Sequence, residues 1–559
     1  MSGAYSLPPG SAAAGGGAAG ALRHAATVLL LRDGAAGLEV LMMRRAERPG
    51  DFRSGACVFP GGVVDARDRA AHACCRGSDD ATMSRRLGLA AGGLDYAVAA
   101  LREAFEEVGL LLADRAVDPA AARPWRQALQ AGTAGIAEMC DALGFGLDLG
   151  GLEYCAHWLT PLGVPKRFDT RFFMARAPAG QEAEADGGEA SELMWITPAA
   201  ALAAAAELKL LPVTRRNLQE LGRFADADAA LADARGRSEI RRVFPRAGRS
   251  RQGREVVLPD GWAYAEIGRL DPEGRGHVST EIVAGVAVAL SERVIRVTAP
   301  NPGRMTGPGT NSYLVGGGGR WTVIDPGPAD ATHLQALLAA AAPGRIERIL
   351  VTHSHVDHSP GAQALAEATG APVFGRYAEF PDGQDASLAL ERELRAGERL
   401  DCGPDTTLEV IHTPGHASNH LCYRLVQEKL LFSGDHVMQG STVVINPPDG
   451  DMAAYLNALR ELQGADLEWL APGHGFLVAD PSAVLRGLIA HRLAREARVL
   501  AALKRQGRAG LDALLPEVYA EVPTVLHPVA RRSLLAHLIK LEADGCAESD
   551  GADWIYALD

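Results

Sequence analysis

The stretch Arg345–His358, RIERILVTHSHVDH, decides the fold of the C-terminal half of this 559-residue chain. Its apolar residues 349–351, two of them β-branched, predict a buried strand, and the histidines follow directly in a strand-end loop. In an extended loop His353 and His355 can both face one ion, while Asp357 and His358 turn toward a second. This spacing predicts a metal site.

Three further candidate ligands each follow an apolar run and stand beside a glycine: His416 after 407–411, Asp435 after 429–431 and His474 after 467–470. Zinc takes nitrogen and oxygen donors at ~2.0–2.2 Å, usually four per ion, so two ions need about seven donors if one bridges. The chain therefore supplies a complete set for two Zn²⁺ ions, namely His353, His355, Asp357, His358, His416, Asp435 and His474.

The region from about Val294 to Gly475 resembles the metallo-β-lactamase superfamily. The resemblance implies an αββα sandwich. It also implies a first metal on His353, His355 and His416, a second on Asp357, His358 and His474, and a bridging Asp435. Antibiotic-hydrolysing relatives commonly place a cysteine where Asp435 stands, which argues against a lactamase. By the same resemblance Asp325 fixes a ligand imidazole, the alternative being a turn-initiating aspartate.

The chemistry expected of this centre is hydrolysis by a hydroxide bound between two metals, because coordination lowers the pKa of water to ~7. Asp357 is the candidate catalytic residue that orients the nucleophile and handles its proton. For His412, His420 and His436 we expect packing or hydrogen-bonding roles.

After Pro481 the sequence is strongly helical to about Ala543. Leu534, Leu538 and Leu541 follow helical spacing, which predicts one buried face. The pattern predicts a small winged-helix-like domain with basic outward positions, among them Arg492 and Arg495. The alternative is a solvated charged face that covers the hydrolase domain.

Two segments, His491-Arg492 and Asn301–Asn311, resemble the lactamase-beta-like endoribonuclease subgroup over roughly Arg293–Leu558. This resemblance implies cleavage of single-stranded RNA phosphodiesters. The same seven ligands also serve glyoxalase-II-type thioester or small-ester hydrolysis, so both functions stay open. A basic groove that joins the tail to the His353 loop would favour the nuclease, and a narrow closed pocket the thioesterase.

In the N-terminal half, the segment Leu101–Leu110 places Glu103, Glu106 and Glu107 on one helix face. Like charges at this spacing cost stability unless a hard divalent cation screens them, and oxygen donors suit Mg²⁺ or Mn²⁺. The alternative is a solvated acidic helix face.

Together with the loop Phe59–Gly62, this segment resembles the Nudix box, G-x5-E-x7-R-E-U-x-E-E-x-G-U. Leu94 stands in place of the box's first glutamate if the count runs back from Arg102. If the count runs from Gly62, Asp68 takes that place and 69–93 form an insertion, which is the preferred interpretation.

Two further segments, Trp158–Pro161 and Phe168–Phe173, look like the subgroup of coenzyme A and nucleoside diphosphate hydrolases. The resemblance covers roughly 22–225 and implies hydrolysis of a nucleoside diphosphate linked to X, or of coenzyme A, with Glu106 as a catalytic metal ligand. The competing hypothesis is a domain that only binds such a ligand and regulates the hydrolase.

Length and composition predict an α/β multidomain protein. We expect a disordered leader (1–22), a Nudix-like α/β/α sandwich (23–243), a linker or hairpin (244–290), the hydrolase domain (291–481) and the winged-helix-like domain (482–559). A net charge of −13 argues against a protein that coats nucleic acid. Eight cysteines without a C-x-x-C pair predict free thiols. No signal or membrane segment is evident, so the expected location is cytoplasmic, and the oligomeric state stays undetermined.

Overall fold

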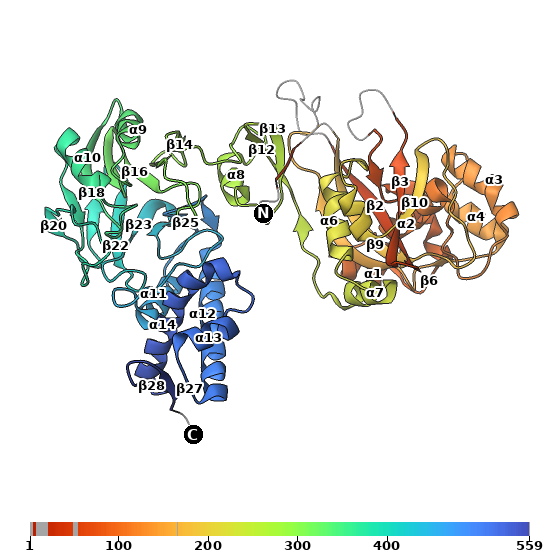
Figure 1. The fold of residues 1–559 in the computed structure, drawn as a ribbon. Helices are drawn as coiled ribbons and strands as arrows, with labels where there is room; N and C mark the ends of the chain where they lie inside the picture. Colours follow the sequence, from red (N-terminus) through yellow and green to blue (C-terminus); the bar gives the residue numbers. More distant parts are fainter. Residues whose placement is uncertain (1–3, 7–20, 48–53, 165, 558–559) are drawn as a thin grey trace. The chain divides into compact units, whose positions relative to one another are not determined.

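The computed structural model describes residues 4–6, 21–47, 54–164 and 166–557. The chain forms two compact units, which divide near residue 261 (Figure 1). Residues 262–272 and 279–559 belong to the C-terminal unit, whereas 273–278 belong to the N-terminal one.

The N-terminal unit is built on an 8-stranded mixed sheet. Its central path has the order β10 (Ala190–Ile196), β3 (Gly37–Arg45), β2 (Leu22–Gly34), β9 (Arg167–Arg176), β8 (Glu153–Leu159) and β11 (Arg242–Val243), with β4 (Cys57–Val58) on β3 and β5 (Gly61–Val63) on β2. Strands β2 and β3 form a hairpin and pair antiparallel up to Gly34 and Gly37. Strand β10 lies at one edge of the sheet, and its side chains are half exposed.

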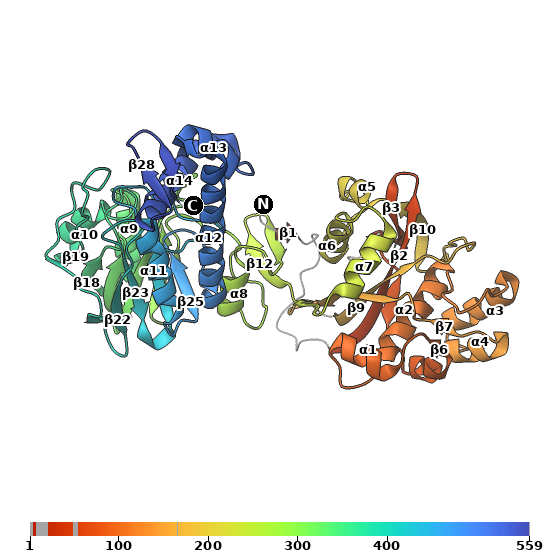
Figure 2. The same ribbon diagram turned by 90° about the horizontal axis from the view of Figure 1, so that it is seen from below.

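Helices cover both faces of this sheet, as the view from below shows (Figure 2). One core lies under α1 (Asp80–Leu87), α2 (Gly93–Val108), α3 (Pro119–Gln130) and α4 (Ile136–Leu143), beside η1 (Ala66–Cys74) and the short pair β6 (Cys75–Arg76) and β7 (Leu147–Asp148). The other lies under α5 (Pro198–Ala203), α6 (Pro212–Leu221) and α7 (Ala227–Gly236). The predicted α/β/α sandwich is confirmed. Helix α2 ends at Val108, because Gly109 takes the left-handed conformation that terminates a helix.

Two expectations about the ends of this unit need correction. The leader 1–22 is not wholly irregular: β1 (Ala4–Ser6) pairs with β13 (Gly253–Val257), which also pairs with β12 (Arg246–Ser250). Residues 7–20 lie outside the described part. The expected linker 244–290 contains the foreseen hairpin, but it also contains α8 (Tyr264–Leu270), which packs on the hydrolase unit through the buried ion pair Glu266–Arg296.

The C-terminal unit contains two facing sheets. The 7-stranded sheet runs β14 (Ala287–Ala289), β15 (Val294–Thr298), β16 (Asn311–Gly317), β17 (Arg320–Ile324), β18 (Arg345–Leu350), β19 (Val373–Gly375) and β20 (Arg392–Glu393). The 6-stranded sheet runs β21 (Arg399–Asp401), β22 (Thr407–His412), β23 (Leu421–Leu425), β24 (Leu430–Gly434), β25 (Trp469–Pro472) and β26 (Val478–Ala479), with η2 (Val426–Glu428) between β23 and β24.

Alternating side chains of the two sheets meet in a shared core, with Tyr313 and Ile324 from one sheet and Tyr423 and Phe432 from the other. The outer face of the first sheet is covered by α9 (Ala331–Ala341) and α10 (Gly361–Thr369). The second is covered by α11 (Met452–Gln463) and the first half of α12 (Pro481–Gln506). The order helix, sheet, sheet, helix confirms the predicted αββα sandwich.

The tail forms a third core from the second half of α12 with β27 (Arg508–Ala509), α13 (Leu511–Val518), η3 (Thr524–Leu526), α14 (His527–Ala543), β28 (Ala547–Ser549) and β29 (Trp554–Tyr556). Leu534, Leu538 and Leu541 are buried as predicted. The expectation that Arg492 and Arg495 face outward is wrong, because both side chains are buried. Among the described residues, no helix combines the length and the apolar character needed to cross a membrane.

Candidate metal centre

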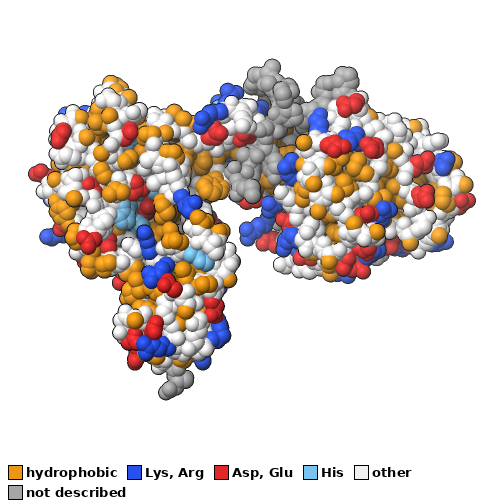
Figure 3. Space-filling model, in the orientation of Figure 1, with side chains coloured by type: hydrophobic (Ala, Val, Ile, Leu, Met, Phe, Trp, Pro, Cys, Tyr) orange, Lys and Arg blue, Asp and Glu red, His pale blue; other side chains and the backbone are white. Residues whose placement is uncertain are grey.

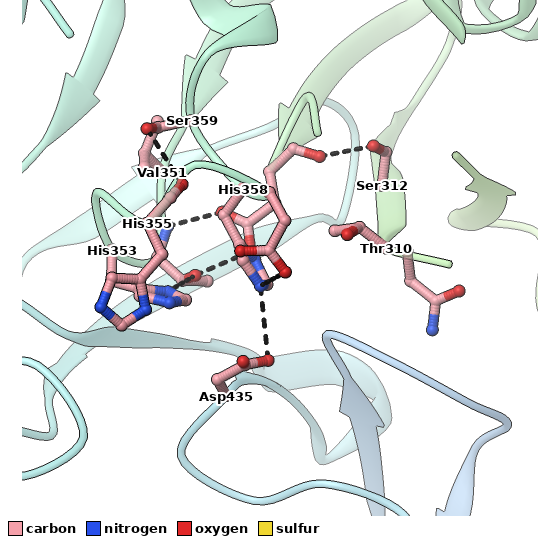
Figure 4. A network of polar contacts seen from close by, with 12 residues as sticks. Thr310, Ser312, Val351, His353, His355, His358, Ser359 and Asp435 are labelled. Atoms are coloured by element: carbon pink, nitrogen blue, oxygen red, sulfur yellow. Dashed lines mark hydrogen bonds and ion pairs between the residues drawn. The ribbon is translucent and has the colours of Figure 1, made fainter. Parts of the chain in front are cut away.

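The candidate ligands lie at the ends of neighbouring strands. The loop after β18 carries four of them, and the loops after β22, β24 and β25 carry one each. Figure 4 shows the contact between His358 of the first loop and Asp435, which comes from the opposite sheet. Residues spread over about 120 positions therefore meet at one rim of the sandwich.

The first group consists of His353, His355 and His416, whose ligand atoms lie within 4.8 Å of one another. The Nε2 atom of His416 is 3.1 Å from Nδ1 of His355. The other ring nitrogen of His416 donates a hydrogen bond of 2.7 Å to the carbonyl oxygen of Val444. That bond turns Nε2 of His416 toward the group.

The second group consists of Asp357, His358, Asp435 and His474, within the same limit. Oδ1 of Asp435 lies 3.4 Å from Nε2 of His358 and 3.2 Å from Nε2 of His474. Its other oxygen, Oδ2, lies 3.9 Å from Nε2 of His416 in the first group. Asp435 thus faces both groups, as a bridging ligand would.

The donor atoms fit metal ions by their lack of other partners. Among the described residues, Nε2 of His353, His358 and His474 and Oδ1 of Asp435 are buried without a hydrogen-bond partner. Buried polar atoms rarely stay unsatisfied without a functional reason. Imidazole and carboxylate groups are also the donors that zinc prefers. All seven predicted ligands are brought together.

The electrostatics of the second group follow from its carboxylates. Burial opposes the charging of His358, yet Asp357, Asp435 and Asp325 raise its pKa well above the ordinary value. Burial would likewise raise the pKa of Asp435, but His474 and His358 hold it well below its usual range. The carboxylates are therefore negative and can compensate a cation.

Comparisons with known proteins agree with this site. Residues 305–474 match the model of the metallo-beta-lactamase superfamily. A "Beta-lactamase-like protein 2 homolog" of Drosophila melanogaster is 31% identical over 268 residues, which cover 46% of this chain and 90% of that protein. The chain belongs to the metallo-β-lactamase superfamily. It is a hydrolase with two further modules, because residues 78–223 match the NUDT19 Nudix domain and 511–554 the beta-lactamase associated winged helix domain.

Other similar proteins have more specific names. The "Atrochrysone carboxyl ACP thioesterase AgnL7" of Paecilomyces divaricatus is 32% identical over 226 residues, covering 39% of this metallo-β-lactamase-superfamily chain and 68% of that protein. Among solved structures, a metallo-beta-lactamase family protein of Thermus thermophilus has a TM-score of 0.42 at 24% identity, covering 48% of this chain and 100% of that one. A NUDIX hydrolase of Alicyclobacillus acidocaldarius has a TM-score of 0.32 at 29% identity, covering 38% and 96%.

In this metallo-β-lactamase-superfamily site, Asp325 connects the two groups of ligands. One of its oxygens, Oδ2, accepts hydrogen bonds of 2.8 Å from Nδ1 of His358 and 2.7 Å from the hydroxyl of Thr352. The Thr352 hydroxyl in turn lies 3.0 Å from Nδ1 of His353. Asp325 is buried with φ of 51°, a left-handed backbone that is unusual for a non-glycine residue. This geometry agrees with an acid that orients ligand imidazoles.

The loop that carries His474 is held by the segment before β16. The buried amide of Asn311 donates to the carbonyl oxygens of Pro472 and Gly475, and Nδ1 of His474 lies 3.2 Å from the carbonyl oxygen of Gly309. Gly473 has no room for a side chain, because a Cβ there would lie 2.6 Å from Oδ1 of Asp435. The segment Asn301–Asn311 therefore supports the candidate ligand His474.

The remaining histidines near the site have the packing and hydrogen-bonding roles that we expected. His412 bonds the carbonyl oxygen of Ser418, and Nδ1 of His420 lies 2.9 Å from the Thr413 hydroxyl. His436 is fully buried, and its ring lies 4.8 Å from that of Tyr455.

A loop that the sequence did not single out borders the centre. Residues 376–385 are fixed to two of the ligand loops, those after β18 and β22, because Glu379 N donates to the Ser418 hydroxyl and Asp385 N to the carbonyl oxygen of Ser354. The loop exposes Tyr377 and Phe380, and the ligand loop itself exposes Val356, 63% accessible between two ligands. In the sequence, the apolar residue Val356 between two candidate ligands is the one feature that could have indicated an apolar border of the site.

The Nudix glutamates lie on α2, beside the Phe59–Gly62 loop. The amide of Gly61 donates to Glu107 at 2.8 Å, and a Cβ on Gly62 would collide with the carboxylate of Glu103. Burial raises the pKa of Glu103 to about 7 and that of Glu107 well above its usual range. Among the described residues, these glutamates do not form a group of three with ligand atoms within 4.8 Å of one another.

The structure distinguishes the two alignments of the box. Asp68 is buried and pairs with Arg102 at 2.7 Å, and Arg102 also bonds Glu103 at 2.9 Å and Glu106 at 3.2 Å. Asp95, the acidic residue next to Leu94, pairs instead with Arg69 and His72. Asp68 therefore joins the glutamate cluster through Arg102, which favours the interpretation with an insertion. A cavity of about 230 Å³ lies beside Arg102 and Glu106, walled by residues 129–136.

Proposed function

We propose that the hydrolase domain holds two Zn²⁺ ions and hydrolyses acyl thioesters. The first ion would be held by His353, His355 and His416, the second by Asp357, His358 and His474, with Asp435 between them. When bound, the ions would lower the pKa of a coordinated water and offset negative charge that develops on the substrate. The unpartnered, buried donor atoms described above support this assignment.

In the reaction Asp357 would act on the attacking water. Burial would raise the pKa of its carboxyl, but the neighbouring His358 and His474 bring it to about 2, so the group is a carboxylate. Its side chain is a quarter exposed, with Oδ2 3.4 Å from Nε2 of His474. From this place it can orient the water and accept its proton.

The observation that carries the choice of a thioester is the apolar border of the centre. Val356, Tyr377 and Phe380 are exposed on the two loops that flank the ligands. Such side chains can contact an acyl chain, and apolar contact contributes roughly 25 cal/mol per Å² removed from water. The thioesterase names of similar proteins, such as the one from Paecilomyces divaricatus, agree with this choice.

RNA cleavage is the second hypothesis, and the charges of the tail count against it. Arg492 and Arg495 are buried, while Arg498, Arg505 and Arg531 pair with glutamate or aspartate. On the face drawn in Figure 3, basic and acidic side chains alternate over the C-terminal helices. Phosphate binding needs clustered free cations.

For the N-terminal domain we propose a Mg²⁺- or Mn²⁺-dependent hydrolysis of a diphosphate linkage, with Glu103, Glu106 and Glu107 as the metal ligands. Buried carboxylates with raised pKa values gain most from a cation, and oxygen is the donor that Mg²⁺ prefers. Coenzyme A contains such a diphosphate, and its acyl derivatives contain a thioester. Acyl-coenzyme A would then be a substrate for both domains.

The test is a parallel assay of the zinc-loaded full chain against acetyl- to palmitoyl-coenzyme A and against single-stranded RNA. We expect thioester hydrolysis that disappears in Asp357→Asn and persists in Asp405→Asn, an aspartate remote from the ligand loops. RNA cleavage that Asp357→Asn abolishes, with intact thioesters, would contradict the proposal in favour of the nuclease.

A separate assay tests the proposed diphosphatase activity of the N-terminal domain. With Mg²⁺ and coenzyme A, wild-type protein should release the two halves of the diphosphate, and Glu106→Gln should not. Full activity of Glu106→Gln would remove the proposed metal role. Binding of coenzyme A without cleavage would support the regulatory alternative instead.

A further inference from the structure

Arg492 lies where α12 passes from one core to another. Before it, Leu485 packs against α11 in the hydrolase core. After it, Val499 and Leu503 pack in the core of the winged helix. The helix therefore belongs to both modules, and Arg492 stands at their junction.

The contacts of Arg492 lie within the hydrolase domain rather than in solvent. The side chain is 3% exposed, and its guanidinium donates a hydrogen bond to the carbonyl oxygen of Val443. The guanidinium also lies over the ring of Tyr455, 5.3 Å from its centroid. Its Nε has no hydrogen-bond partner among the described residues. Burying a cation costs free energy unless other groups compensate the charge. We therefore expect the contacts of Arg492 to have a role in the protein.

The segment that Arg492 holds is the one that orients His416. Val443 precedes Val444, whose carbonyl oxygen accepts the 2.7 Å hydrogen bond from Nδ1 of His416. Both residues follow β24 in a stretch without helix or strand, so the peptide depends on such contacts for its position.

Tyr455 supports the same ligand from the other side. Gly415, the neighbour of His416, approaches α11 so closely that a Cβ there would lie 2.4 Å from Cα of Tyr455. The Tyr455 hydroxyl donates to the carbonyl oxygen of His436 at 3.1 Å. Arg492 therefore contacts two of the structures that fix His416.

We propose that Arg492 is a positioning residue for His416, through which the C-terminal module stabilises the first metal site. The inference rests on the proposed metal centre. It gives the tail a role in metal binding and makes Arg492 part of the hydrolase rather than of a nucleic-acid surface. Removing the guanidinium would leave the Val443 carbonyl without its donor and free His416 to turn. Loss of such outer contacts typically lowers metal affinity about 10- to 100-fold.

Arg495 offers a matched control one turn further along α12. It is also buried, donates to a backbone carbonyl, that of Val518, and lies over an aromatic ring, that of Tyr519, at 4.1 Å. Its contacts stay within the winged helix. Arg492→Met and Arg495→Met thus remove the same kind of group from two different surroundings.

The experiment measures zinc affinity by chelator competition on the full chain, together with the absorption spectrum of the Co²⁺-loaded protein. We expect Arg492→Met to lower the affinity of one of two sites about 10- to 100-fold and to change the cobalt spectrum. Arg495→Met should retain both wild-type affinities and the spectrum. Arg492→Lys should recover part of the affinity, since it can still donate to Val443.

The outcomes separate the inference from the proposed function. Wild-type protein that takes up no zinc would overturn the metal centre itself. Wild-type protein with two sites that Arg492→Met leaves unchanged, or that both Met variants weaken equally, would overturn the role of Arg492. If Arg492→Met does not fold, Arg492→Lys and Arg495→Lys provide the comparison, and equal affinities would overturn the inference.

Discussion

The two candidate metal sites of this chain differ in how their ligands are satisfied. In the hydrolase domain, His353, His358 and His474 each aim an unpartnered buried nitrogen at the centre. In the N-terminal domain, Arg102 already bonds Glu103 and Glu106. The ligand nitrogens of the hydrolase domain are therefore free to bind a cation tightly. In the N-terminal domain a cation must compete with Arg102 for the same carboxylates. We therefore expect tight zinc binding in one domain and weak, exchangeable magnesium in the other.

The largest expected effect comes from Asp435, which faces both groups of ligands. Asp435→Ala should abolish binding of the second ion and weaken the first, and should lower thioester hydrolysis on the order of 10³-fold, equal to ~4 kcal/mol of transition-state stabilisation. Steady-state kinetics with acyl-coenzyme A measure this loss. The coenzyme A diphosphatase of the same protein is the internal control and should not change.

The next effect concerns Glu103, the carboxyl whose pKa burial raises from 4.5 to about 7. Such a group stabilises the fold while protonated, and the contribution is lost as the pH rises through the folded pKa. Without Mg²⁺, Glu103→Gln should therefore melt like wild type below pH 4.5. Above pH 7 it should be more stable, by at most about 3 kcal/mol.

Calorimetry of the full chain with and without Mg²⁺ checks this prediction. Added Mg²⁺ should stabilise wild type and not the variant, which should also lose about 100-fold in diphosphatase activity. A stability difference that does not depend on pH would contradict the burial of an ionisable, cation-binding carboxylate.

A smaller effect is expected from Asp325, which joins the two metal groups through His358 and Thr352. Asp325→Asn keeps the size but removes the charge, and should lower zinc affinity at both sites about 10- to 100-fold. Chelator competition measures it. Asp405→Asn is the matched control, because Asp405 has a similar left-handed backbone with φ of 47° but no contact with a ligand. Wild-type affinity in Asp325→Asn would show that the aspartate only shapes a turn.

The smallest effect is expected on the surface of the tail. Arg505 pairs with Glu517 on exposed helices. Exposed ion pairs contribute about 0.2–1 kcal/mol, so Arg505→Ala should lower the free energy of unfolding by no more than this and leave thioester hydrolysis unchanged. A large loss of RNA cleavage in this variant would instead indicate that the tail binds nucleic acid.

The sequence was sufficient to predict both sandwich folds and to place every candidate ligand just after a strand, because each candidate follows an apolar run. It could not reveal how the imidazoles are oriented. The acceptor for His416 is a backbone carbonyl, that of Val444, and any residue could provide it. The Thr352 hydroxyl, which lies between Asp325 and His353, is likewise placed by the local backbone conformation and not by a recognisable motif.

The error about Arg492 and Arg495 has a physical cause. Helix α12 is 26 residues long and packs one stretch in the hydrolase core and another in the winged helix. A helix that serves two cores buries different faces along its length, so one amphipathic pattern cannot describe it. Arginines at the junction then look like surface positions in the sequence, although the fold encloses them.

The most direct test of the account is the zinc stoichiometry of the metal-free full chain, measured by isothermal titration in excess Mg²⁺. We expect two equivalents of tightly bound zinc per chain, unaffected by Mg²⁺, and a single weakened site in Asp435→Ala. Less than one equivalent in the wild type, or two equivalents retained by Asp435→Ala with unchanged affinity, would contradict it.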